Sequence, residues 1–139
     1  MEWTTELRYK RYEDWTEEEK KQIKENMAKS PWHTHYHVEP TSGLLNDPNG
    51  FSYFDGKWIL FYQNFPFGAA HGLKSWVQLE SDDLVHFNET GVKVFPDTPL
   101  DSHGAYSGSA MQFDDKLFLF YTGNVRDENW IRHPYQIGA

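Results

Sequence analysis

The sequence predicts an all-β fold built from propeller blades, preceded by a short N-terminal helix. The main observation is an internal repeat, because residues 54–62 and 113–121 share the pattern F-D-[GD]-K-x-x-L-F-Y at an offset of 59. Each copy joins a two-residue turn to a continuous apolar strand, as in strands buried on both faces. Aromatic residues make up 17% of the chain, which favours a β-rich core. Repeated antiparallel units of this size indicate a propeller, with chance similarity as the alternative.

The first segment, residues 1–30, is polar and predicts one helix. Thr16 and Glu19 have the spacing of a capping box, in which each side chain bonds the other residue's backbone N–H. Three consecutive acidic residues then lie at the positive end of the helix dipole. We expect a surface helix over residues 17–29 that packs lightly through Ile23.

Composition excludes several classes of function. The net charge is −8 and the chain shows no basic patch, so nucleic acid is not an expected partner. The chain has no cysteine, which excludes disulfides and thiolate metal sites. His33, His35 and His37 alternate as on one strand face, but we expect neither a metal nor another cofactor. No apolar run approaches the roughly 18 residues of a spanning helix, so we expect a cytoplasmic protein without membrane contact.

The second segment, residues 31–139, predicts an incomplete propeller domain. Expected strands cover residues 51–54, 57–63, 75–81, 92–95, 107–113 and 116–122, with another strand starting at 136–139. They make one complete blade and most of a second, whereas a propeller needs at least about four. We therefore expect either the amino-terminal part of a larger protein or self-association through uncovered blade edges.

The most informative motif is the run L-L-N-D-P-N-G at residues 44–50. Asp47 precedes a proline, which favours an extended backbone at the aspartate. The Pro-Asn-Gly sequence that follows is strong turn chemistry. These preferences predict a carboxylate at the lip of a tight turn with Asn46 beside it. An ordinary turn without a function remains the alternative for this motif alone.

A series of motifs in this order resembles glycoside hydrolase family 32, the invertases, fructanases and sucrose-6-phosphate hydrolases. The motifs stand at residues 46–50, 61–63, 76, 81–86, 106–109 and 119–123, and the resemblance covers about residues 35–139. Residues 68–76 and Leu44 are similar to the bacterial sucrose-6-phosphate hydrolase branch. The resemblance implies the first blade and most of the second blade of a five-bladed propeller.

The resemblance also implies roles for individual residues. Asp47 is expected to be the nucleophile that attacks a terminal β-D-fructofuranoside with retention, which requires a second, acidic carboxyl group about 5–5.5 Å away. The residues expected to bind the sugar are Leu44, Leu45, Asn46, Gln63, Trp76, Tyr106 and Ser107. Core packing stays the alternative for Trp76 and Tyr106, and a ladder-end amide for Gln63.

The acid/base residue of this family is not recognised in the chain. Glu80 and Glu128 are poor candidates, and the Arg-Asp pair at 126–127 follows its strand too closely for the family's sugar-binding pair. His71 and Lys74 offer positive groups to a substrate phosphate, or are exposed loop residues. Three interpretations remain: an inactive fragment of an enzyme acting on sucrose or sucrose 6-phosphate, a non-catalytic carbohydrate-binding module, and a self-assembling propeller fragment.

Overall fold

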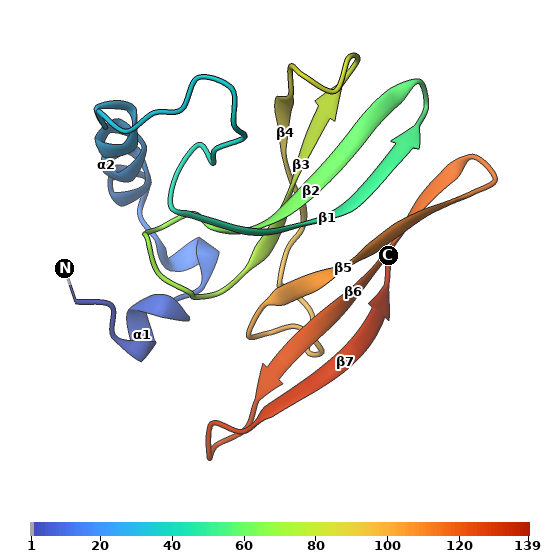
Figure 1. Cartoon of the computed structure of the whole chain (residues 1–139). Helices are drawn as coiled ribbons and strands as arrows, with labels where there is room; N and C mark the ends of the chain where they lie inside the picture. Colours follow the sequence, from blue (N-terminus) through green and yellow to red (C-terminus); the bar gives the residue numbers. More distant parts are fainter. Residues whose placement is uncertain (1) are drawn as a thin grey trace.

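The computed structural model describes residues 2–139 and contains two antiparallel sheets with helical segments at the N-terminal end (Figure 1). The first sheet has the order β1-β2-β3-β4, made of Leu44–Phe54, Lys57–Phe65, Ser75–Ser81 and Asn88–Val94. The second has the order β5-β6-β7, made of Ala105–Phe113, Lys116–Arg126 and Arg132–Gly138. The two sheets are the first blade and most of a second blade, which confirms the predicted fold class.

Strand β1 differs from the prediction at the Asn-Asp-Pro-Asn-Gly motif. The motif is not a tight turn between elements, because residues 44–54 form one strand paired with β2. The register with β2 shifts between Asn46 and Pro48 and again between Asn49 and Ser52. At each shift β1 has an extra residue without a partner in β2, as in a β-bulge. The motif therefore bends a strand that continues through it. Asp47 has a left-handed backbone with φ 44°, so the expected extended conformation is wrong.

The N-terminal segment packs against the loop between β2 and β3 (Figure 1). It contains α1 (Thr5–Arg8), η1 (Tyr12–Asp14) and α2 (Glu17–Ala28), of which only α2 was predicted. The capping box at the start of α2 is present as predicted. Trp15 stacks on Phe67 at 4.2 Å between ring centroids, and Ile23 of α2 packs against the same cluster. The backbone N–H of Leu73 donates to Arg8 O at 2.7 Å, which ties α1 to this loop.

A hydrophobic core joins the two blades. Its buried members come from both sheets: Ile59, Phe61, Trp76, Val94, Ala105, Leu119 and Tyr121. Trp76 is completely buried, and its indole Nε1 donates to Tyr106 O at 3.1 Å. The inner strands β1 and β5 thereby stand next to each other, which brings their side chains into one site.

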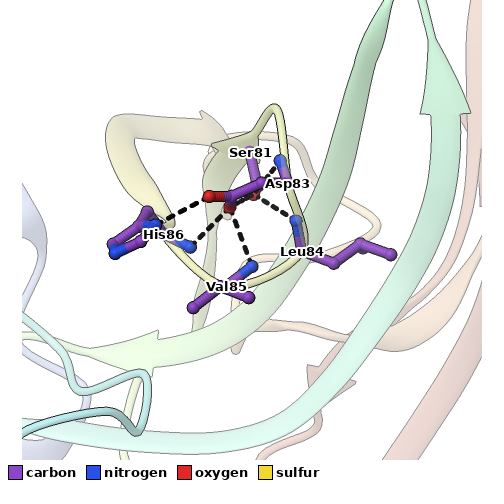
Figure 2. Close-up of polar contacts among 5 residues, drawn as sticks. All are labelled: Ser81, Asp83, Leu84, Val85 and His86. Carbon is purple, nitrogen blue, oxygen red and sulfur yellow. Dashed lines mark hydrogen bonds and ion pairs between the residues drawn. The ribbon is translucent and has the colours of Figure 1, made fainter.

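The loop between β3 and β4 is a compact turn capped by side chains (Figure 2). Asp83 Oδ1 accepts from the backbone N–H groups of Val85 and His86 at 2.9 and 2.8 Å. Ser81 Oγ accepts from the N–H of Leu84 at 2.8 Å, and Leu84 has φ 65°. The motif at 81–86 therefore has an architectural role in connecting two strands.

Residues 31–43 form no strand, so the expected alternation of His33, His35 and His37 on one strand face is wrong. His33 instead lies 2.6 Å from Glu39 through its Nδ1. Across residues 2–139, no group of three or more His, Cys, Asp or Glu side chains is arranged to hold a metal. Within the same residues, no helix has the length and apolarity needed to cross a membrane.

Candidate active site

Two β-bulges at equivalent positions present Asp47 and Ser107. In β1, Asn46 pairs with Gln63 and Pro48 with Tyr62, which leaves Asp47 as the extra residue. In β5, Tyr106 pairs with Thr122 and Gly108 with Tyr121, which leaves Ser107 as the extra residue. Gly108 allows this bulge, since an added Cβ would lie 1.8 Å from Phe120 O. A bulge re-aims the side chain it carries, and here both side chains point to one place.

Asp47 accepts hydrogen bonds from both blades on one carboxylate oxygen. Ser107 Oγ donates to Asp47 Oδ2 at 2.9 Å, and Gln63 Nε2 donates to the same oxygen at 3.2 Å. No group of residues 2–139 donates to Oδ1, and the side chain is exposed. One oxygen is therefore held while the other stays available to a reactant.

A chain of polar groups connects a buried lysine to this carboxylate. Lys74 is only 2% exposed, and its ammonium donates to Asn46 Oδ1. With that oxygen engaged, Asn46 Nδ2 donates to Gln63 Oε1 at 3.2 Å, which leaves the Gln63 NH₂ group facing Asp47. Burial lowers the pKa of Lys74 to about 8, and the charge of Asp47 opposes that shift. Lys74 thus orients the amides and adds positive charge beside the carboxylate.

These residues surround a pocket of about 550 Å³ between the blades and the N-terminal segment. Its lining consists of Arg8, Tyr9, Asn46, Asp47, Gln63, His71, Gly72, Lys74, Tyr106, Ser107, Thr122, Arg126 and Arg132. Asp47 is the one carboxylate in this lining. Burial raises the pKa of Tyr106, with Tyr9 adding to the effect, so its hydroxyl stays protonated over the ordinary pH range.

The structure brings together five of the eight residues that the sequence suggested for the site: Asn46, Asp47, Gln63, Tyr106 and Ser107. Trp76 has no exposed surface, so the expectation that its ring faces a sugar is not met. Leu44 and Leu45 do not line the pocket, and Leu45 packs instead against the cluster of Tyr62, Val77 and Leu79. Gln63 lies inside β2, which ends at Phe65, so the alternative of an amide at the end of the strand is not met. Its side chain donates to Asp47.

Several pocket residues escaped the sequence reasoning. Arg8 and Tyr9 come from the polar N-terminal segment, where no local pattern marks them. Arg126 and Arg132 end β6 and begin β7, where the hairpin turns back on the pocket. For Lys74 the sequence predicts either a phosphate contact or an exposed loop residue, and its burial excludes the exposed position. Glu80 and Glu128 do not line the pocket.

Comparisons with known proteins identify relatives of this chain. The N-terminal domain of glycosyl hydrolases family 32 matches residues 37–139. Sucrose-6-phosphate hydrolase from Streptococcus mutans serotype c is 74% identical over 133 residues, covering 96% of this chain and 28% of that protein. The corresponding Lactococcus lactis protein is 58% identical over 139 residues, covering all of this chain and 29% of that protein. The chain therefore spans under a third of the length of these relatives.

Solved structures give the same result. Sucrose-6-phosphate hydrolase from Lactobacillus gasseri superposes with a TM-score of 0.95 at 54% identity, covering 99% of this chain and 28% of that one. A mutant of a Bombyx mori β-fructofuranosidase in complex with sucrose superposes with a TM-score of 0.67 at 29% identity, covering 90% and 28%. By sequence match and by fold, the chain belongs to glycoside hydrolase family 32, and its residues 37–139 match the N-terminal domain of that family.

Proposed function

We propose that this chain supplies the nucleophile of a retaining β-fructofuranosidase acting on sucrose or sucrose 6-phosphate. Asp47 attacks the anomeric carbon of the fructosyl unit, and the bond to the glucosyl oxygen breaks as the new ester bond forms. The leaving oxygen takes its proton from a carboxylic acid outside these 139 residues. Water then hydrolyses the fructosyl ester and restores the Asp47 carboxylate.

The observation that carries this proposal is the arrangement around Asp47. A nucleophilic carboxylate must be oriented and reachable, and both conditions have a counterpart here. Ser107 and Gln63 hold Oδ2, while Oδ1 accepts no hydrogen bond from residues 2–139. The cation of Lys74, two amides away, compensates the negative charge. Asp47 is the one carboxylate in the pocket lining, so these residues supply a nucleophile but not the second carboxyl group that acts as the acid/base.

The substrate class rests on the relatives. The Streptococcus mutans and Lactococcus lactis proteins are sucrose-6-phosphate hydrolases, and the Bombyx mori structure contains sucrose. Both sugars present the same terminal fructosyl unit to a nucleophile. We therefore propose a sucrose-type β-fructofuranoside for the Asp47 site.

A chimera tests the proposal: this chain replaces the matching 28% of the Streptococcus mutans relative. We expect the chimera to hydrolyse sucrose 6-phosphate and Asp47→Asn to reduce kcat at least about 10³-fold, since the amide is not a nucleophile. Asp114→Asn is the matched control, because Asp114 also has a left-handed φ of 53° but lies in an exposed hairpin turn. Full activity of the Asp47→Asn chimera would show that another residue is the nucleophile.

The isolated chain gives the complementary result. We expect no enzymatic sucrose hydrolysis, because the pocket contains one carboxylate where two are required. Turnover by the isolated chain that Asp47→Asn abolishes would refute this expectation. Fructose binding measured by calorimetry, together with a chimera that lacks activity, would favour the non-catalytic carbohydrate-binding alternative.

A further inference from the structure

The pocket around Asp47 collects positive charge in a chain that is otherwise acidic. Its lining contains Arg8, Lys74, Arg126 and Arg132 against one carboxylate, although the whole chain carries a net charge of −8. Three of the four arginines in the chain therefore line this one pocket. Concentration of like charges costs free energy unless an anion compensates them.

Acidic side chains of the protein do not provide that compensation. Five of the nine other Lys and Arg side chains form ion pairs with Asp or Glu, namely Lys10, Arg11, Lys20, Lys21 and Lys57. Within residues 2–139, Arg8, Arg126 and Arg132 form none. Lys74 has a different task, because it is buried and bonded to Asn46. The three guanidinium groups are the cations left without a negative partner in this pocket.

Each guanidinium is positioned by a different element. Arg8 ends α1, whose last carbonyl accepts from Leu73 beside the pocket. Arg126 Nη1 donates to Trp130 O at 2.8 Å, and its guanidinium lies 5.2 Å from the Trp130 ring centroid. Arg132 lies 5.7 Å from the Tyr106 ring centroid. These contacts orient the arginines without neutralising them.

Two of these side chains are also poorly satisfied. The Nε atoms of Arg8 and Arg126 are buried, and no acceptor in residues 2–139 bonds to them. A desolvated guanidinium with unused donors gains more from an anion than a fully hydrated one. Planar guanidinium groups match phosphate oxygens in pairs, which makes arginine the usual residue for phosphate recognition.

We propose that Arg8, Arg126 and Arg132 form a subsite for the phosphate of a phosphorylated sucrose whose fructosyl unit is attacked by Asp47. The inference rests on the function proposed above and assigns the chain to sucrose 6-phosphate over sucrose. A phosphate monoester carries a charge of about −1.5 to −2 at pH 7, whereas the hydroxyl of sucrose is neutral. Arg8 lies outside the family match at residues 37–139, so the N-terminal segment adds this selectivity to the propeller.

The chimera described above also tests this subsite. We expect Arg8→Gln, Arg126→Gln and Arg132→Gln each to lower the ratio of kcat/KM for sucrose 6-phosphate to that for sucrose about tenfold or more, because each removes a charge-assisted contact. Any loss in kcat/KM for sucrose should be smaller, because sucrose carries no phosphate for these arginines to contact. Arg11→Gln is the matched control, since Arg11 is the remaining arginine and pairs with Glu13 at 3.5 Å.

Ionic strength gives a second measurement that needs no variant. The KM for sucrose 6-phosphate should rise with added salt, because ions screen the arginines, while the KM for sucrose should stay constant. If a glutamine variant does not fold, this salt dependence and Arg132→Lys, which keeps the charge, decide the question. Arg132→Lys should retain more of the substrate ratio than Arg132→Gln.

The failure of this inference can be told apart from failure of the proposed function. An unchanged substrate ratio in the three glutamine variants, or equal losses on both sugars, would overturn the phosphate subsite. If Asp47→Asn still abolished turnover in that case, the nucleophile assignment would stand. Activity that persists in Asp47→Asn would instead overturn the function, whatever the ratio.

Discussion

Asp47 occupies a backbone conformation that its own sequence disfavours. Its φ of 44° is left-handed, and the following proline would by itself favour an extended residue. Aspartate tolerates this region better than most residues, at a cost of about 1–2 kcal/mol. The pairing of Asn46 with Gln63 and Pro48 with Tyr62 imposes the conformation on the residue between them. Local preference identified the residue, but tertiary pairing decides where its carboxylate points.

Lys74 gives a pH-dependent prediction at the same scale. Burial lowers its pKa to about 8 from 10.5, so the unfolded chain binds more protons between these values. Stability should therefore rise with pH in this window, by about 2 kcal/mol between pH 7.5 and 9.5. Urea unfolding of the chain should show this rise, and Lys74→Met should abolish it.

Lys93→Met is the control for this measurement, because Lys93 is exposed on β4 and its removal should preserve the rise. A Lys74→Met chain that keeps the full rise would show that another group titrates. The position also marks a limit of sequence reasoning. A lysine after His-Gly-Leu resembles an exposed loop residue, but in the fold Lys74 is 2% exposed, its ammonium donates to Asn46 Oδ1 and its carbonyl accepts from the N–H of Ala105.

The repeat unit explains why the two blades build one site. The hairpins repeat at an offset of 59, yet Asp47 and Ser107 are 60 residues apart because β1 contains a second irregularity between Asn49 and Ser52. The repeat and the apolar second strands were predictable, since turns and hydrophobic runs have sequence signatures. The bulges were not, because an extra residue only shifts the alternation of side chains by one position, and residues 44–54 and 105–113 show no regular alternation in which a shift could be seen.

The β3–β4 turn gives a prediction for an element. His86 Nδ1, 2.7 Å from Asp83 Oδ2, and the N–H groups of His86 and Val85 hold the pKa of Asp83 well below its usual range. A lowered folded pKa adds stability above pH about 4, which is lost as the pH falls further. Asp83→Ala should lower Tm at pH 7, by a margin that shrinks below pH about 4.

Asp82→Ala is the matched control, since the neighbouring Asp82 makes only an exposed ion pair with Lys57 at 2.7 Å. Exposed pairs of this kind contribute little, so Tm should change little. Equal losses in the two variants would show that Asp83 has no special part in the turn. Thermal unfolding followed by circular dichroism at several pH values makes the comparison.

For the whole molecule, the two faces of the second sheet differ. One face carries Leu117, Leu119, Tyr121 and Ile137 into the core shared with the first blade. The other carries Met111, Phe113 and Phe120, which are 52%, 58% and 45% exposed. This alternation follows from the period of two in β5 and β6. Because residues 117–121 are apolar without a break, the sequence does not reveal which face of this strand another sheet covers.

An exposed apolar face of this kind favours association, so we expect the isolated chain to self-associate in a concentration-dependent way. Sedimentation velocity should show larger species that dissociate on dilution, and the double variant Met111→Lys, Phe120→Lys should be monomeric, since charges on this face oppose its burial. Val85→Lys is the control, because Val85 is 69% exposed but stands in the β3–β4 loop away from this face. A chain that stays monomeric at every concentration would contradict association through this face. Equal dissociation by Val85→Lys would point instead to a general effect of charge.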